Sequence, residues 1–261
     1  GNAYVLEQGD GMSTATVVRV PAGGGPSQVV VPPGDGLVTP TAMAVDAAGN
    51  LFIADASVGG VSRFGADGSV NTSFITGLTN VTALAVDSSG NLYIAQSGAE
   101  HDILEVYAAG ARRVIAGAGA TSSADNVPAA SALFVAPSGL ALGPNGLSIA
   151  DAGAHLVYTI DAAGIIHIVA GNGTTVNTSS TLATGTGLLL PVGLASDAAG
   201  DLYIADQAAN RIYEVYPFAS SGVTITTVIG TGAAGYGGDG GPATSATLQS
   251  PSAVALDGSG N

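Results

Sequence analysis

A short segment recurs along the 261-residue chain, and this repeat limits the possible folds more than any other feature of the sequence. Each copy joins two apolar stretches through a turn, and the second stretch ends in an acidic or amide residue. Four copies are continuous, namely AMAVDAAGNLFIAD (42–55), ALAVDSSGNLYIAQ (83–96), GLALGPNGLSIAD (139–151) and GLASDAAGDLYIAD (193–206). A fifth copy is divided, because AVALDGSGN (253–261) would continue into GNAYVLE (1–7) when the two are overlaid on their shared Gly-Asn.

Each repeat unit predicts four strands. Two strands flank the Asp-x-x-Gly-Asn turn, in which the aspartate can cap the turn and the glycine can take a positive φ. A loop then leads to a third strand and a second turn to a fourth, for example over 156–161 and 165–169. Four strands joined by hairpin-length connections describe one antiparallel propeller blade. Alternation predicts that one isoleucine of each second strand lies in the core: Ile53, Ile94, Ile149 and Ile204.

The number of repeats predicts the number of blades. The longer units contain three Gly-, Ser-, Thr- and Ala-rich segments (118–138, 171–191 and 230–250) without a second strand pair. We therefore expect residues 1–261 to form a single all-β domain, a five-bladed propeller of four-stranded antiparallel blades. Its last blade would take the inner strand from 253–257 and the outer three strands from the N-terminal end. The alternative is a part of a six-bladed or longer array.

Two stretches carry a family resemblance. The sequence PVGLASDAAGDLYIADQAANRI (191–212) resembles an NHL repeat, and GTGAAGYGGDGGPATSATLQSP (230–251) is similar to the segment between blades in bacterial and teneurin-type NHL propellers. The resemblance extends over essentially the whole chain, although Gly143 replaces the turn aspartate in one copy. NHL propellers most often have six blades, so the resemblance also leaves the longer array open.

Charge excludes several classes of partner. The chain has 19 acidic residues against five basic ones, all arginines, and a net charge of −14. Nucleic acids and anionic membranes are bound through clustered Lys and Arg, so neither is expected. No apolar run is long enough for membrane insertion. Without cysteine, disulfides, thiolate zinc sites and cysteine nucleophiles are excluded. The lysine-free, Thr-, Ser- and Asn-rich composition favours an extracellular or periplasmic bacterial protein.

The ends of the second strands are the main candidate ligand-binding positions. They carry equivalent side chains in the five repeats: Glu7, Asp55, Gln96, Asp151 and Asp206. Such side chains could form a ring at the mouth of the channel and bind a cation or a polyhydroxylated ligand. The alternative is that each side chain stabilises its own loop through bonds to the backbone. The turn aspartates on the opposite face are interpreted as structural.

The histidines give little support for catalysis. His101 and His155 fall in equivalent loops of adjacent blades, whereas His167 falls in an outer strand. The two loop histidines could bind a metal with Asp102 or Asp151, but isolated surface histidines are far commoner. We predict no metal site and no cofactor. A G-x-S-x-G nucleophile motif is also absent from the sequence.

The sequence therefore favours a non-catalytic binding or scaffold propeller, with a metal-dependent propeller lyase or hydrolase as the alternative. We expect a monomer that binds a protein, a peptide or a glycan on the face of the three long segments. His101, His155 and Tyr236 are expected on that face with the strand-end residues, because loops on a rigid scaffold usually carry binding surfaces. The negative charge favours a neutral or cationic partner.

Overall fold

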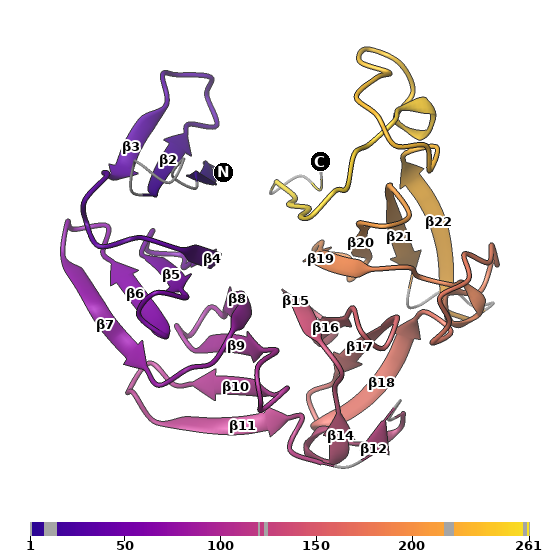
Figure 1. Cartoon of the computed structure of the whole chain (residues 1–261), viewed down its shortest axis with the longest axis horizontal. Coiled ribbons are helices and arrows are strands. Elements are labelled where there is room, and N and C mark those ends of the chain that lie inside the picture. Colours follow the sequence, from indigo (N-terminus) through magenta and orange to yellow (C-terminus); the bar gives the residue numbers. More distant parts are fainter. Residues whose placement is uncertain are drawn as a thin grey trace.

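The computed structural model describes residues 2–7, 15–119, 121–122, 125–216, 222–257 and 260. Five antiparallel sheets stand side by side around a central axis, with the inner strands β4, β8, β15 and β19 facing that axis and the outer strands at the rim (Figure 1). The chain is thus an all-β, five-bladed propeller, as the repeat predicts.

The blades follow one another in chain order. Blade 1 contains β1 (Ala3–Glu7), β2 (Thr16–Val20) and β3 (Gln28–Val31), and blade 2 contains β4 (Pro40–Val45), β5 (Leu51–Asp55), β6 (Gly60–Phe64) and β7 (Val70–Thr76). Blade 3 contains β8 (Val81–Val86), β9 (Leu92–Gln96), β10 (Ile103–Val106) and β11 (Arg112–Ala116). Blade 4 contains β15 (Pro137–Gly143), β16 (Gly146–Asp151), β17 (Leu156–Ile160) and β18 (Ile165–Ala170). Blade 5 contains β19 (Pro191–Ser196), β20 (Leu202–Asp206), β21 (Arg211–Tyr216) and β22 (Thr224–Ile229).

The core lies between neighbouring blades. All four predicted isoleucines, Ile53, Ile94, Ile149 and Ile204, are 0% exposed, which confirms their place in the core. Because both faces of a blade pack against a neighbour, apolar side chains can be buried on either face. Inner strands also bond across blades: the Thr82 hydroxyl donates to the Pro137 carbonyl at 2.7 Å, and the Ser138 hydroxyl donates to the Pro191 carbonyl at 2.9 Å.

The aspartate of the Asp-x-x-Gly-Asn turn has the structural role that was expected. In blade 2, Asp46 Oδ1 accepts bonds from the amides of Ala48 (2.9 Å) and Asn50 (2.8 Å). The Asn50 side chain donates to Asp46 and accepts a bond from the Ala66 amide in the next turn. The asparagine thus joins the two turns at this end of the blade.

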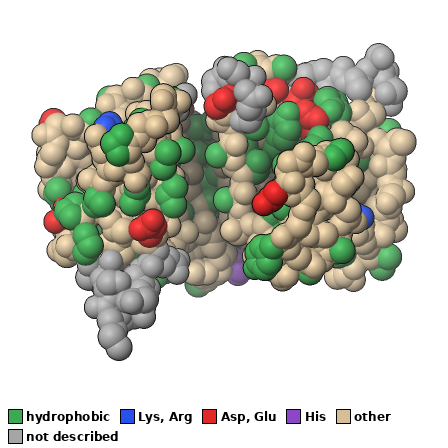
Figure 2. All heavy atoms as spheres, turned by 90° about the horizontal axis from the view of Figure 1, so that it is seen from above, with side chains coloured by type: hydrophobic (Ala, Val, Ile, Leu, Met, Phe, Trp, Pro, Cys, Tyr) green, Lys and Arg blue, Asp and Glu red, His purple; other side chains and the backbone are tan. Residues whose placement is uncertain are grey.

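The ring does not close as predicted. The β1 strand pairs with β2 alone in the described structure, and residues 251–257 contain no strand, so 253–257 does not complete the blade begun by Tyr4–Glu7. An opening separates the N-terminal blade from the C-terminal segment, and Figure 2 shows a deep cleft between the two parts.

Packing explains the position of the C-terminal segment. A Cβ added to Gly193 in β19 would lie 2.7 Å from the Ala253 Cα, much as one added to Gly139 in β15 would lie 2.4 Å from the Val192 carbonyl oxygen. Ser252 and Ala253 therefore lie against β19 much as Val192 of β19 lies against β15. The accumulated rotation of five blades does not bring this segment to β1 (Figure 1).

Two of the three long segments also depart from expectation, because they do not remain on one face. The segment before blade 4 forms β12 (Thr121–Ser122), β13 (Val127–Pro128), η1 (Ala129–Ser131) and β14 (Ala132–Leu133). There, β13 pairs with the outer edge of β18, and the Ala129 amide bonds to the Gly164 carbonyl at the opposite end of the blade. The next long segment contains η2 (Ala183–Gly185), and its Leu182 bridges to Thr224 on the edge of β22.

The third long segment contains η3 (Ala243–Ser245). In the described structure only the segment before blade 4 has strands of its own, each two residues long, so the three segments hold no further blade, as predicted. Among the described residues, no helix has the length and apolar character that a membrane span requires.

Candidate binding groove between blades 4 and 5

The carboxylates that end the second strands hold the linkers between blades. Asp206 is 0% exposed and accepts bonds from the amides of Leu189 (2.8 Å), Leu190 (2.9 Å) and Ala209 (3.1 Å). Asp151 is equally buried and binds the amides of Val135, Ala136 and Ala154 in the same way. These contacts support the loop-anchoring interpretation, because the carboxylate oxygens satisfy buried backbone donors.

Asp55 and Gln96 repeat this arrangement with local differences. Burial alone raises the pKa of the Asp55 carboxyl, but hydrogen bonds from Ser57, Val38 and Thr39 outweigh it and hold the pKa below its usual value. Gln96 accepts the Thr79 amide at 2.8 Å and donates to Asp102 at 2.8 Å. In blade 3 the strand end thus carries an amide, and the buried carboxylate beside it belongs to Asp102 in the following loop.

The remaining predicted site residues do not form one cluster. Glu7 ends β1 and is exposed, and Tyr236 is 91% exposed in the third long segment. His101 and His155 occupy equivalent loops with positive φ values of 47° and 57°, and His155 Nδ1 lies 2.9 Å from the Leu189 carbonyl oxygen. Among the described residues, no three or more His, Asp or Glu side chains form a group that could hold a metal. Ligand binding at the predicted positions stays a prediction.

A row of paired side chains runs across each blade and differs in blade 4. In blade 3 the row is Tyr93–Glu105–Arg113, and in blade 5 it is Tyr203–Glu214–Thr226. In blade 4 the same positions hold Ser148–Thr159–His167. A large phenol and a carboxylate are thus replaced by two small hydroxyl groups.

The polar side chains of the blade 3 row form hydrogen bonds with one another. Tyr93 donates to Glu105 at 3.1 Å, and Arg113 donates to the other oxygen of Glu105 at 2.7 Å. In blade 4, the Ser148 and Thr159 hydroxyls lie 2.9 Å apart and bond to each other. Two hydroxyl groups hold two protons, so this single bond leaves one proton and several lone pairs for another partner.

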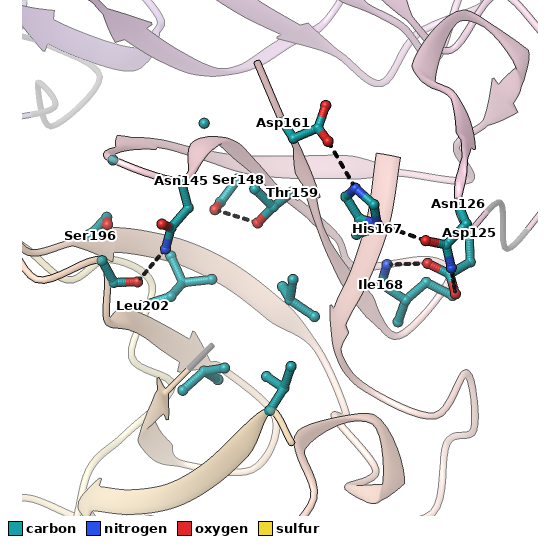
Figure 3. A pocket seen from close by; sticks show the side chains of 16 residues that line it. Asp125, Asn126, Asn145, Ser148, Thr159, Asp161, His167, Ile168, Ser196 and Leu202 are labelled. Carbon is teal, nitrogen blue, oxygen red and sulfur yellow. Dashed lines mark hydrogen bonds and ion pairs between the residues drawn. The ribbon is translucent and has the colours of Figure 1, made fainter. Parts of the chain in front are cut away.

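The blade 4 row lines a groove of about 430 Å³ between blades 4 and 5. Such a volume is within the range of small-molecule sites. Figure 3 shows Ser148 and Thr159 beside Asn145 on one side and His167 on the other. The blade 5 side supplies apolar groups from Leu202, Val215 and Val223. Grooves also separate blades 1 and 2 and blades 3 and 4, so the blade 4 row is distinguished by its chemistry rather than its volume.

One edge of the groove is a chain of hydrogen bonds between β18 and the linker that covers it. His167 Nε2 lies 3.2 Å from Asp161 Oδ2, and His167 Nδ1 lies 3.1 Å from Asn126 Oδ1. Asp125 accepts the Asn126 side-chain amide (2.9 Å) and the Ile168 backbone amide (3.0 Å). Hydrogen bonds from the Ile165 backbone and then from His167 hold the pKa of the Asp161 carboxyl below its usual value.

The opposite edge is formed by the unusual turn of blade 4. Gly143 pairs directly with Gly146, so Pro144 and Asn145 form a two-residue turn without the usual aspartate. The Asn145 side chain instead donates to the Gly200 carbonyl of blade 5 at 3.0 Å. The asparagine therefore bridges the mouth of the groove (Figure 3).

The predicted site omits every groove residue. Two sequence signals marked the region, since Gly143 departs from the turn motif and Ser148 replaces the aromatic residue of the other repeats. Neither signal reveals that Asn126 and His167 line the same groove as Ser148, because that arrangement depends on how the linker follows β18.

Comparison with known proteins identifies the architecture. Neither a protein-family model nor a curated protein matches the chain. Among solved structures, an auxiliary nutrient binding protein from Bacteroides thetaiotaomicron has a TM-score of 0.70 and 14% identity over 95% of this chain and 60% of that chain. The chain has the β-propeller fold. A protein of unknown function from the same species has a TM-score of 0.68 and 18% identity over 97% of this chain and 61% of its own length.

An enzyme shares the fold as well. Virginiamycin B lyase from Staphylococcus aureus matches with a TM-score of 0.54 and 14% identity, over 87% of this chain and 70% of the lyase. The chain thus spans about three fifths of the two Bacteroides propellers and a larger part of the lyase. At such identities the likeness concerns fold alone, so function must be argued from the residues of this chain.

Proposed function

We propose that this chain is a non-catalytic binding propeller of the bacterial cell exterior, and that a small molecule binds in the groove between blades 4 and 5. The observation that carries the proposal is the pair of small hydroxyl residues Ser148 and Thr159 in blade 4. The other four blades pair an aromatic with a charged side chain at these two positions, namely Tyr4–Arg19, Phe52–Arg63, Tyr93–Glu105 and Tyr203–Glu214. Propeller stacking does not require this change, since the larger pair is accommodated in blades 3 and 5.

Two further observations support binding rather than catalysis. The buried strand-end carboxylates Asp151 and Asp206 are engaged by backbone amides, so they are poor candidates for an acid or base that must exchange protons with a substrate. Nutrient-binding proteins also share the fold with this chain. The exterior location rests on composition, and docking of a protein, peptide or glycan on the loop face is a separate proposal.

The experiment is a ligand screen, followed by replacement of Ser148 and Thr159 with the tyrosine and glutamate found in blades 3 and 5. Saturation-transfer NMR on the whole chain would test small neutral, cationic and anionic fragments together with mono- and disaccharides. In the double variant Ser148→Tyr/Thr159→Glu, the Tyr–Glu pair of blades 3 and 5 should fill the floor of the groove and abolish binding of the screened ligand while the fold is kept. Tyr203→Phe changes the same row in blade 5, outside the groove, and serves as the control.

Two results would contradict the proposed groove site. If the double variant keeps its thermal transition and still binds the ligand with unchanged affinity, the groove is not the binding site. Loss of binding in both the double variant and Tyr203→Phe would also contradict the proposal, because the effect would then not be local.

A further inference from the structure

The floor of the groove can form hydrogen bonds without carrying a charge. Ser148 and Thr159 are 7% and 8% exposed, and both belong to the groove lining. Their mutual hydrogen bond leaves one hydroxyl proton and free lone pairs, so the pair can donate to one group and accept from another. A single hydroxyl group of a ligand satisfies both requirements, because it is a donor and an acceptor at once.

The electrostatics of the groove disfavour anions. Two carboxylates, Asp125 and Asp161, stand at one edge, and no Lys or Arg is among the described lining residues. A ligand carboxylate or phosphate would therefore meet like charge without a Lys or Arg side chain to compensate for the loss of water. The net charge of −14 acts in the same direction over a longer range.

The two carboxylates of Asp125 and Asp161 stabilise a bound cation only weakly, because their oxygens already accept hydrogen bonds. Asp161 already accepts bonds from His167 and from the amides of Ala163 and Ile165, and Asp125 accepts from Asn126 and Ile168. An ammonium group would have to leave water for an uncharged floor and a partly satisfied edge. A neutral head group avoids this cost.

The wall opposite the floor selects the chemical character of the part of the ligand that does not bind to the hydroxyl pair. Leu202, Val215 and Val223 form this wall, and the described lining residues include no Phe, Tyr or Trp. Apolar surface stabilises a ligand in proportion to the area that leaves water. A compact apolar body fits such a wall, whereas a sugar would bury several hydroxyl groups against it without partners.

We propose, on the basis of the binding function argued above, that the groove selects a neutral alcohol with a compact apolar body. Its hydroxyl group bonds to the Ser148–Thr159 pair, and its body packs against Leu202, Val215 and Val223. The shared chemistry is that of small alicyclic or branched aliphatic alcohols.

Three probes of nearly equal shape test the inference: cyclohexanol, cyclohexylammonium and cyclohexanecarboxylate. Titrations of the ¹⁵N-labelled whole chain, followed by amide chemical shifts, give the affinity and the location of each probe. Cyclohexanol is expected to shift amides of β16, β17 and β20 and to bind most tightly, with the carboxylate weakest.

The nearly isosteric double variant Ser148→Ala/Thr159→Val removes the hydroxyl groups but keeps the groove. The loss of a neutral hydrogen bond should weaken cyclohexanol binding about threefold to tenfold. Thr226→Val removes a hydroxyl group from the same row in blade 5, at an exposed position outside the groove lining, and should leave binding unchanged.

The outcomes separate this inference from the proposed function. Groove binding of either ion at equal or higher affinity than cyclohexanol overturns the ligand class and leaves the groove as a binding site. Unchanged cyclohexanol affinity in Ser148→Ala/Thr159→Val overturns the role of the hydroxyl pair. Absence of cyclohexanol shifts in the groove also overturns the inference, while continued binding of a screened ligand in the groove-filling variant would overturn the proposed function.

Discussion

The buried carboxylate of Asp206 provides the sharpest test of how the propeller is held together. It accepts hydrogen bonds from the amides of Leu189, Leu190 and Ala209, and it has no exposed surface. In Asp206→Ala all three amides lose their acceptor. An unsatisfied buried donor costs about 1–3 kcal/mol, so even the lower value gives about 3 kcal/mol for the three groups.

Detachment of the linker in Asp206→Ala would lower the unfolding free energy by a similar amount. The linker before β19 could detach so that water reaches the amides, but this would expose Leu188, which is 0% exposed. Exposure of a buried leucine costs about 1.5–3 kcal/mol. We therefore expect the unfolding free energy to fall by about 3 kcal/mol, with faster hydrogen exchange at Leu189 and Leu190.

The assay is urea denaturation followed by circular dichroism, with hydrogen exchange as a local readout. Asp239→Ala is the matched control, because it removes the same charge at an exposed position and should change the unfolding free energy by less than about 0.5 kcal/mol. Asp206→Asn keeps one acceptor oxygen and should lie between the two. A change in Asp206→Ala no larger than that of the control would refute the anchoring argument.

Three further predictions concern single side chains. Burial first, and then the nearby Glu100 charge, raise the pKa of Asp102. The ionised carboxylate therefore lowers the stability of the fold at pH values above that pKa, and this destabilisation disappears as the pH falls through the pKa. Asp102→Asn should therefore be more stable than wild type at pH 7, with a difference that shrinks toward pH 3 in denaturation curves; a constant difference would argue against it. Ile204→Ala should lower the unfolding free energy by about 2–5 kcal/mol, and a value typical of surface substitutions would contradict its place in the core. The buried Tyr158 hydroxyl has no hydrogen-bond partner among the described residues, so Tyr158→Phe should leave stability unchanged or raise it in thermal melts, whereas a large loss would reveal a missing partner.

The sequence alone determined the blades and their local geometry. Residues such as Ile53 and Ile204 lie on one face of their strand and the adjacent residues lie on the other, and this period of two is dictated by the strand itself. The turn role of Asp46 could also be predicted, because its partners Ala48 and Asn50 are two and four residues away. Interactions over such short distances depend little on the rest of the fold.

The strand-end positions were found from the repeat, but their role was decided by contacts with distant residues. Asp206 reaches amides that precede it by 16 and 17 residues, and only the folded linker brings them together. The sequence allowed either an anchor or a ligand ring. The hydrogen bonds of the tertiary structure favour the anchor.

Tertiary structure alone decided the open ring, the paths of the long segments and the groove. Ring closure depends on small rotations between blades that accumulate over five packing interfaces, and a repeat motif does not encode their sum. The Gly- and Ser-rich linkers have no hydrophobic period, so their contacts with β18 and β22 could not be deduced. The groove joins Ser148 to Asn126 and Leu202 from three separate parts of the chain, because the packing of two blades and one linker places them around the same space.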